Sequence, residues 1–176
     1  MKDNSEELLP VVDEKGNLLG VSTRGECHSG LTRPLHPVVH LHLFNTAGDL
    51  YLQRRPDWKD IQPGRWDTAV GGHVDPGETI DEALRREARE ELGITGFEPE
   101  FLAKYVFESD RERELVHTFR AVSHEPVTPS EETAGGRFWS LTEIRSHLGH
   151  GIFTPNFEQE FQRLFGVEGR VLRMEN

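Results

Sequence analysis

The sequence predicts an α+β sandwich, and two observations lead to this fold class. Apolar residues alternate with polar residues in several short stretches bounded by turn residues, which is typical of strands joined in hairpins. Helical spacing of apolar residues is found at residues 80–92 and in two short segments near the end of the chain. Hairpin strands combined with few helices favour an α+β arrangement over a doubly wound parallel sheet.

Length and composition narrow the class of protein. The 176 residues fit a single domain spanning 1–176, long enough to bury a stable core. A formal net charge of −11 at pH 7 argues against a nucleic acid polymer or an anionic membrane as partner. The single cysteine, Cys27, excludes an internal disulfide bond and is consistent with a reducing compartment. With a polar, acidic start and no long apolar stretch, the sequence predicts a cytoplasmic protein.

The first third of the chain is expected to form two hairpins. Apolar residues on both sides of a turn at 15–17 predict an N-terminal hairpin over residues 11–21. Residues 21–35 have weak periodicity and are expected to connect this hairpin to the next strands. The stretch at 36–55, HPVVHLHLFNTAGDLYLQRR, predicts two strands around a turn from Asn45 to Asp49, and a loop punctuated by proline and glycine follows at 56–67.

A helix is expected from Ile80 to Leu92. Thr79 and Glu82 have the spacing of a capping box, and Gly93 supplies a C-terminal stop. Residues four apart form a stripe that can face the core, namely Leu84, Ala88 and Leu92.

The rest of the chain is expected to add a strand pair, a further strand and two short helices. The pair is predicted at 101–109 and 114–122, and the single strand at 137–140. The helices are expected to begin near Thr142 and Pro155. The second helix has one apolar face, which is more typical of core packing than of a ligand site, formed by Phe157, Phe161 and Leu164.

Three glutamates of the 80–92 helix are expected to share one face. Glu87, Glu90 and Glu91 are spaced at i, i+3 and i+4, so their carboxylates repel one another unless a cation lies between them. Mg²⁺ and Mn²⁺ prefer oxygen ligands and commonly bridge protein carboxylates to phosphates. The alternative is a solvated helix surface on which arginines neutralise the glutamates, namely Arg85, Arg86 and Arg89.

The spacing of the whole segment resembles a known motif. Gly72, Glu78 and the run from Arg86 to Ile94 match every fixed position of the Nudix box, so residues 72–94 resemble the Nudix hydrolase superfamily. The resemblance implies a Nudix α/β/α sandwich with a mixed central sheet. It also implies Mg²⁺ or Mn²⁺ as cofactor and a small-molecule diphosphate as substrate, and it allows a homodimer, since many Nudix proteins are dimers.

The resemblance implies roles for the residues of the box. Glu87, Glu90 and Glu91 would bind the metal together with a backbone carbonyl at Gly71 or Gly72, where the absence of a Cβ permits a close approach. Arg86 would orient Glu87 for catalysis, and Glu78 would tie down the loop. The general base is left open between three carboxylates, those of Glu90, Glu91 and Glu114.

The flanking segments resemble a narrower branch of the superfamily, which contains isopentenyl-diphosphate isomerase and related hydrolases. Segments that carry this resemblance include RGECHSG, LHPVVHLHLFN and QRRPDWKDIQPGRWD. The isomerase uses a cysteine just before the GH of its box, and Gly71 stands at that position here. A glycine offers no acid, and the box is complete, so both features favour hydrolysis over isomerisation.

The same resemblance implies a second metal site. The residues at the matching positions are histidines and glutamates, which suit Mn²⁺ or Zn²⁺, namely His28, His36, His73, Glu112 and Glu114. The alternative is that they are ordinary surface or buried polar residues. His40 and His42 alternate on one strand face, where they are expected either to line the site or to form buried polar packing.

Basic residues ahead of the box are expected to bind the substrate phosphates, because arginine suits bidentate recognition of phosphate and lysine adds a point charge. They are Arg54, Arg55, Lys59 and Arg65, and the alternative is that they only solvate a loop. The sequence therefore predicts a metal-dependent hydrolase that cleaves a diphosphate linkage in a small nucleotide-like or other phosphorylated metabolite. Two alternatives are an enzyme like isopentenyl-diphosphate isomerase and a catalytically silent binding module.

Overall fold

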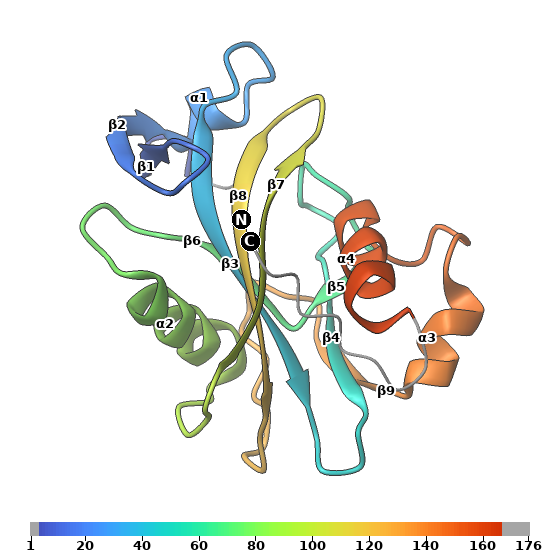
Figure 1. The fold of residues 1–176 in the computed structure, drawn as a ribbon. Helices are drawn as coiled ribbons and strands as arrows, with labels where there is room; N and C mark the ends of the chain where they lie inside the picture. Colours follow the sequence, from blue (N-terminus) through green and yellow to red (C-terminus); the bar gives the residue numbers. More distant parts are fainter. Residues whose placement is uncertain (1–3, 167–176) are drawn as a thin grey trace.

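The computed structural model describes residues 4–166, so the ends of the predicted 1–176 domain, residues 1–3 and 167–176, lie outside the described residues. Runs of consecutive strands are separated by single helices, and two helices close the range (Figure 1). The strands are β1 (Leu8–Val12), β2 (Leu18–Thr23), β3 (Leu35–Phe44), β4 (Leu50–Arg54), β5 (Trp66–Thr68), β6 (Val70–His73), β7 (Glu100–Glu108), β8 (Arg113–Val122) and β9 (Gly136–Trp139). The helices are α1 (Arg24–Cys27), α2 (Ile80–Leu92), α3 (Leu141–His147) and α4 (Pro155–Phe165).

The central sheet is mixed, as predicted. Its strands follow the order β5-β4-β3-β8-β7, with β6 paired to β3 and β9 paired to β4. β3 runs parallel to β8 along its whole length, while the other pairs are antiparallel. On its other edge, β3 pairs with β6 over residues 38–41 and meets β4 only at Phe44. β6, which opens the Nudix-like segment, is therefore held against the middle of the sheet.

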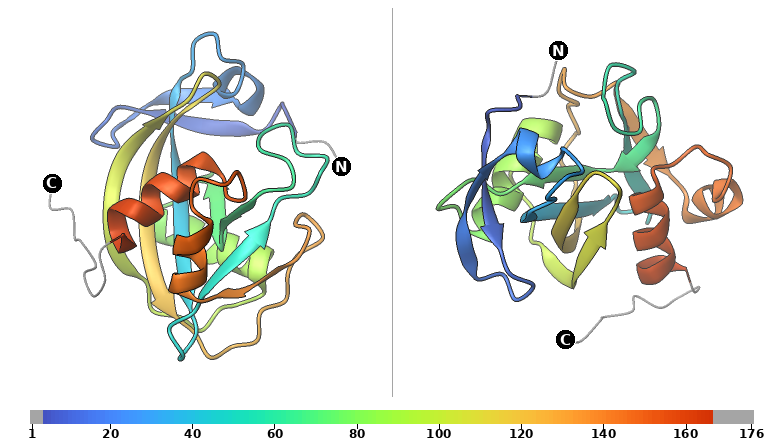
Figure 2. Two further views of the ribbon diagram at one scale, coloured as in Figure 1. Left: turned by 90° about the vertical axis from the view of Figure 1, so that its right-hand side faces the viewer. Right: turned by 90° about the horizontal axis from the view of Figure 1, so that it is seen from above.

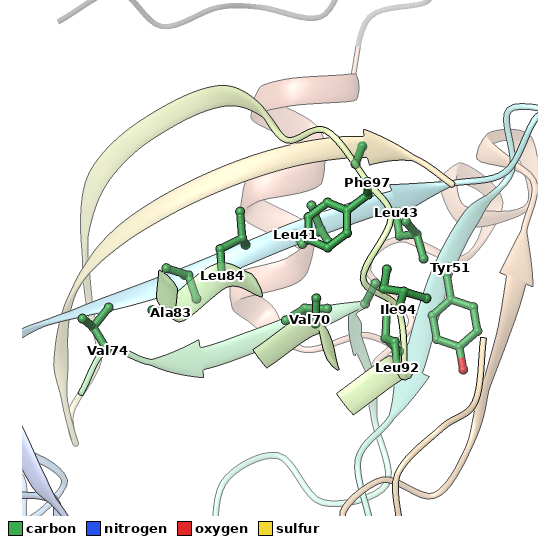
Figure 3. Close-up of a cluster of buried hydrophobic side chains, with 14 residues drawn as sticks. Leu41, Leu43, Tyr51, Val70, Val74, Ala83, Leu84, Leu92, Ile94 and Phe97 are labelled. Carbon is green, nitrogen blue, oxygen red and sulfur yellow. The ribbon is translucent and has the colours of Figure 1, made fainter. Parts of the chain in front are cut away.

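Helices cover both faces of this sheet and confirm the predicted sandwich. In the left view of Figure 2, α4 lies in front of the sheet and α2 behind it. Alternate residues of β3 serve the two faces, because successive side chains of a strand point in opposite directions. Val39, Leu41 and Leu43 join the core under α2 (Figure 3), whereas His40 and His42 point toward α4.

Helix α2 begins and ends where the sequence predicts. The Thr79 hydroxyl accepts a hydrogen bond from the backbone of Glu82, whose carboxylate accepts one in return, so the capping box is present. Gly93 adopts a left-handed conformation with φ of 68°, and its N–H bonds to the carbonyl of Arg89. The predicted apolar stripe is buried, formed by Leu84, Ala88 and Leu92.

The region before β3 differs from the expectation in two ways. The hairpin of β1 and β2 occupies residues 8–23 and includes a bulge between Val11 and Val12, so it is longer than the predicted 11–21. The segment 21–35, expected to be a connection, contains the one-turn helix α1. Thr23 and Glu26 form a second capping box, a local signal that weak apolar periodicity conceals. This turn buries Cys27 and leads directly into His28.

Helices α3 and α4 pack on the face opposite α2. Phe157, Phe161 and Leu164 of α4 are buried against residues of β4, β7 and β9, as expected from their spacing. Thr154 caps α4 and also donates a hydrogen bond of 3.0 Å from its hydroxyl to Asp67 of β5. α4 is therefore anchored to the strand that precedes β6. None of the helices within residues 4–166 is long and apolar enough to span a membrane.

Candidate active site

The last glutamate of the helical trio ties α2 to two strands. One Glu91 carboxylate oxygen accepts hydrogen bonds from the backbone N–H of Gly71, at 3.3 Å, and from the side-chain amide of Gln53, at 3.1 Å. Gly71 lies in β6 and Gln53 in β4, so this carboxylate sits where the two strands separate along the edge of β3. Gln53 is a contact that the sequence pattern did not identify.

Glu87 lies against the glycine pair that opens the motif. An ideal Cβ at Gly72 would lie 2.2 Å from the Glu87 carboxyl carbon, so only glycine allows this approach. Arg86 donates hydrogen bonds from one guanidinium nitrogen to Glu87, at 2.9 Å, and to Glu90, at 3.2 Å. The Glu87 side chain is 13% exposed and that of Glu90 is 55% exposed. The carboxylates therefore differ in exposure, since that of Glu87 packs against the backbone of β6 and that of Glu90 reaches solvent.

Arg86 holds the loop between β6 and α2 in place. Its guanidinium forms a bidentate pair with Glu78, at 2.7 and 3.0 Å, and also bonds to the His73 carbonyl at 3.0 Å. Glu78 in turn accepts a hydrogen bond of 2.8 Å from the backbone N–H of Asp75. These bonds lower the pKa of Glu78, chiefly through Arg86. Since the guanidinium is occupied by carboxylates and a carbonyl, this geometry supports an orienting role for Arg86.

The surroundings of the half-buried Glu87 and Glu91 carboxylates disfavour negative charge on both groups. Burial raises the pKa of Glu87 to about 7, although Arg86 acts in the opposite direction. Burial also raises the pKa of Glu91 well above its usual value, and the charge of Glu87 adds to the effect. Crowded carboxylates with raised pKa values beside an open backbone are the environment that a divalent cation stabilises.

A second cluster lies at the other end of β6. It brings together His28 after α1, His36 of β3 and His73 of β6, whose ring centroids are 5.3 to 5.5 Å apart. One potential ligand atom from each of these histidines lies within 4.8 Å of the others, and the same holds for His36, Glu112 and Glu114. The structure therefore brings all five residues of the predicted second site together.

His36 belongs to both ligand sets, and one of its two ring nitrogens is available to bind a metal. Its Nδ1 lies 3.0 Å from the carbonyl of Pro34, while Nε2 is buried and has no hydrogen-bond partner among residues 4–166. This is the arrangement of a metal-binding histidine, in which one nitrogen bonds to a carbonyl and orients the other. Burial lowers the pKa values of His36 and His73, which keeps both rings neutral and able to bind a metal.

Comparison with known proteins identifies the family. The model of the NUDIX domain matches residues 34–158, which is more than half of the chain. The chain belongs to the Nudix family. An uncharacterized Nudix hydrolase of Streptomyces coelicolor is 32% identical over 174 residues, covering 96% of this chain and 94% of the relative.

Two further Nudix comparisons place the chain in its branch and fold. An isopentenyl-diphosphate Delta-isomerase of Photorhabdus laumondii is 29% identical over 164 residues, covering 88% of this chain and 93% of the relative. The crystal structure of the Deinococcus radiodurans protein DR0079 has a TM-score of 0.77 and 26% identity, with coverage of 90% of this chain and 99% of that chain. The predicted family, branch and Nudix fold are confirmed, as is the enzyme class, that of Nudix pyrophosphohydrolases.

The four basic residues predicted to bind phosphate fall into two groups in this Nudix chain. Arg54 bonds to the Gly64 carbonyl at 3.2 Å and Arg65 bonds to the Phe153 carbonyl at 3.3 Å, so both hold backbone segments together. Arg55 is nearer the carboxylates, because its guanidinium lies 3.5 Å from Asp67 and its charge acts on Glu112 and Glu114. Lys59 lies over the ring of Trp58, 4.9 Å from its centroid, and its charge acts on His73.

Glu160 and Asp67 join the Nudix site without having been predicted from the sequence. Glu160 of α4 accepts hydrogen bonds from His40 and His42, so one nitrogen of each ring belongs to a buried polar network. Asp67 of β5 lies between the two clusters, since its charge raises the pKa values of both Glu91 and Glu114. No periodicity or spacing marks these two carboxylates, because each meets its partners only after the chain has folded.

Proposed function

We propose that this Nudix chain is a divalent-metal-dependent hydrolase that cleaves a diphosphate linkage in a small nucleotide-like or other phosphorylated metabolite. The observation that carries the proposal is the packing of the Glu87 and Glu91 carboxylates against the backbone of Gly71 and Gly72. Oxygen donors at this density, beside a backbone that lacks side chains, suit a cation that also contacts phosphate oxygens.

The metal would be Mg²⁺ or Mn²⁺, held by Glu87, Glu90 and Glu91 together with the backbone carbonyl of Gly71. The oxygen-only donor set and the raised pKa values of the buried carboxylates fit such a cation. When bound, the cation supplies an acidified water and neutralises charge on the phosphate oxygens. The side chains of the chain itself then orient the ligands, accept a proton and bind the substrate.

Two carboxylates are suited to accept the proton from the attacking water. Glu91 lies at the glycine pair, and Glu114 lies on β8 with a pKa raised to about 8, by burial first and by the charge of Glu112 second. A base whose pKa lies near the working pH combines availability with driving force. Glu90, the third predicted base, is more exposed and is bonded to Arg86. We therefore favour Glu91 and Glu114 over Glu90.

The substrate phosphates would be bound by Arg55 and Lys59, whose charges already act on the histidines and glutamates of the site. Arg55 also bonds to the Ile61 carbonyl, at 2.9 Å, but its second nitrogen faces Asp67 at 3.5 Å. Arg54 and Arg65 bond to backbone carbonyls without such a contact to Asp67, so they would support the loop. This division assigns phosphate recognition to two of the four predicted residues. The organic half of the substrate is left to experiment.

A second metal site is supported by its own observation. His36 offers a ligand atom within 4.8 Å of those of two other histidines and of two glutamates, and its Nε2 is buried without a hydrogen-bond partner among residues 4–166. Histidine nitrogen with carboxylate oxygen suits Mn²⁺ or Zn²⁺. This site keeps isomerase-like chemistry as the second candidate function, since a relative named as an isopentenyl-diphosphate Delta-isomerase matches along most of the chain. Gly71, with no side chain to supply an acid, counts against it.

A product screen tests the proposal. The purified chain is incubated with nucleoside triphosphates, dinucleoside diphosphates, nucleotide sugars and prenyl diphosphates in Mg²⁺, in Mn²⁺ and in a chelator. Phosphorus NMR follows bond cleavage, and proton NMR follows the double bond of isopentenyl diphosphate. Metal-dependent cleavage of one class is the expected result and excludes a silent binding module. Double-bond migration without cleavage would establish the isomerase-like function instead.

Three predictions made from the sequence remain predictions. The chain is expected to be cytoplasmic and to act without a nucleic acid polymer or membrane as partner, and the family resemblance allows a homodimer. Gel filtration with light scattering on the purified chain tests the dimer. The single domain over residues 1–176 also stays a prediction, because the family match covers residues 34–158.

A further inference from the structure

A buried carboxylate on α4 gathers three donors beneath the candidate active site. The Glu160 side chain is 0% exposed and accepts hydrogen bonds from His40 Nδ1 at 2.7 Å, His42 Nε2 at 2.8 Å and the Tyr105 hydroxyl at 2.6 Å. Burying a carboxylate is costly unless hydrogen bonds and a counter-charge compensate. The three donors satisfy its lone pairs, and the two imidazoles are the groups in contact with it that can carry positive charge.

The two histidines on Glu160 differ in what their other ring edge meets. The side chain of His42 is 0% exposed, its ring packs edge-on against Phe165, and its Nδ1 is buried without a partner among the described residues. That of His40 is 11% exposed. Both bond to the same carboxylate, so the difference lies in the surroundings of the free edge. The free ring edge of His42 faces the core, whereas that of His40 is partly exposed.

The partly exposed edge of the His40 ring lies beside Gly71. His40 and Gly71 are directly paired across β3 and β6, so a side chain at either position points to the same face of the sheet. An ideal Cβ at Gly71 would lie 3.6 Å from Cδ2 and 3.9 Å from Nε2 of His40. Gly71 itself is exposed. The space that a side chain at position 71 would fill therefore forms an opening beside the Nε2 edge of His40.

This opening adjoins the carboxylates of the proposed function. The N–H of Gly71 bonds to Glu91, and the charges of Glu114 and Asp67 both act on His40. A diphosphate bound here meets mostly negative side chains, so a donor from the floor of the site would offset repulsion. Charge-assisted hydrogen bonds to phosphate are among the stronger polar contacts in proteins.

We propose that His40, oriented by Glu160, is a substrate-contacting residue whose Nε2 donates a hydrogen bond to a phosphate oxygen through the opening left by Gly71. The role rests on the proposed diphosphate hydrolysis and adds a contact to it. The buried Glu160 carboxylate needs a counter-charge, and its 2.7 Å contact with Nδ1 favours a His40 ring that carries a proton on both nitrogens. Position 71 then controls access to this donor.

A pair of matched variants tests the contact. His40→Asn keeps an amide nitrogen near the position of Nδ1 for Glu160 but places nothing at the position of Nε2. His42→Gln keeps a nitrogen for Glu160 on the histidine that does not reach the site. The probe is methylenediphosphonate with Mg²⁺, a diphosphate that resists hydrolysis, titrated by calorimetry into each folded variant. We expect His40→Asn to weaken its affinity by about ten- to a hundredfold and His42→Gln to leave it unchanged.

Two outcomes of this titration would overturn the proposal. If His40→Asn binds the probe as tightly as the parent chain, His40 does not contact the phosphate. If His40→Asn and His42→Gln lose the same affinity, the loss comes from disruption of the structure around Glu160 and not from a lost contact. His40→Gln guards against a folding defect, because its amide nitrogen reaches the position of Nε2. It should retain more affinity than His40→Asn, and the reverse order would contradict the assignment. A parent chain that fails to bind the probe at all would count against the proposed function instead.

Gly71→Ala tests the opening itself. The added methyl group makes ordinary van der Waals contact with His40, so the chain should fold, but the methyl group covers the Nε2 edge. We expect it to weaken diphosphonate binding in the parent chain and to have little further effect in the His40→Asn background. If Gly71→Ala alone does not weaken diphosphonate binding, Gly71 does not give access to His40. The same conclusion follows if the affinity losses of Gly71→Ala and His40→Asn add up in the double variant.

Discussion

The carboxyl group of Glu87 occupies the space beside the backbone of Gly72 that a side chain at position 72 would fill. An ideal Cβ at Gly72 would lie 2.2 Å from its carboxyl carbon. The first glycine of the Nudix box and the first of its three candidate metal-binding glutamates therefore pack directly together, although a loop and more than a turn of helix separate them in the sequence. The glycine fixes how closely this carboxylate approaches the backbone of β6.

Gly72→Ala should displace Glu87 from β6 and weaken metal binding. The methyl group cannot coexist with the observed carboxylate position, so we expect the affinity for Mg²⁺ to fall by about ten- to a hundredfold. Gly20→Ala in β2 is the matched control, since a Cβ there meets nothing within 4 Å. Calorimetric titration with Mg²⁺ checks both variants. Unchanged affinity in Gly72→Ala would place the cation away from Glu87.

Metal binding should strengthen as the pH rises through neutrality. The pKa of Glu87 is raised to about 7, so below that pH a proton competes with the cation for this carboxylate. We expect the increase in Tm caused by Mg²⁺ to be larger at about pH 8 than at about pH 6. Glu87→Gln should reduce this pH dependence to the part that comes from Glu91, whose pKa is also raised. An increase in Tm that is the same at both pH values in the parent chain would exclude Glu87 as a ligand.

The Glu160 network should stabilise the fold within a defined pH window. The raised pKa of His40 contributes stability below its ordinary value of 6.5, and this is lost as the pH rises toward about 9. The lowered pKa of Glu160 contributes stability above its ordinary value of 4.5, and this is lost on acidification below that value. The contribution is therefore largest between these two ordinary values.

Glu160→Gln should lower the free energy of unfolding by about 3–5 kcal/mol, the cost of breaking a buried charge pair. The loss should be larger at about pH 6 than at about pH 9, where His40 is losing its proton. Glu158→Gln on the same helix is the control, because the glutamine side-chain oxygen can still accept the hydrogen bond from the Gly149 N–H. Urea denaturation at the two pH values measures both variants. A loss that does not vary with pH would mean that the pair is not ionised.

The His36 site makes a prediction about metal content. We expect the parent chain to bind one Mn²⁺ or Zn²⁺ more per chain than His36→Ala, because His36 is common to both ligand sets. Atomic absorption on dialysed protein counts the metal. His117→Ala, which removes a histidine of β8 outside these sets, is the control. Equal metal content in all three proteins would reduce the cluster to buried polar packing.

The sequence predicted those parts of the structure whose signals are local. Helix α2 agrees with its expected bounds because the capping box, the apolar stripe and the C-terminal glycine all lie within its own segment. Glu87, Glu90 and Glu91 followed from the same periodicity. The hairpin was longer than expected because its outer strand residues alternate poorly, and Leu18 and Leu19 are both exposed. Helix α1 was missed because a one-turn helix has too few residues to show a period.

The contacts that complete the site were beyond the reach of pattern analysis. His40 and Glu160 are 120 positions apart, and nothing near Glu160 distinguishes it from Glu158, the other acidic residue of α4. Gln53 and Asp67 reach the site because β4, β5 and β6 share one side of β3. The five residues of the second cluster were gathered by resemblance, and the pairing of β3 with β6 and β8 explains why they meet.

The most direct test of the central claim compares turnover with stability in Glu91→Gln. The glutamine can still accept the hydrogen bonds from Gly71 and Gln53, and it removes a carboxylate whose burial is unfavourable. At saturating Mg²⁺, on the diphosphate that the screen identifies, we expect kcat to fall by at least about a hundredfold while Tm stays equal or rises. Turnover comparable to that of the parent chain would contradict a metal-dependent hydrolase centred on the glutamates of α2.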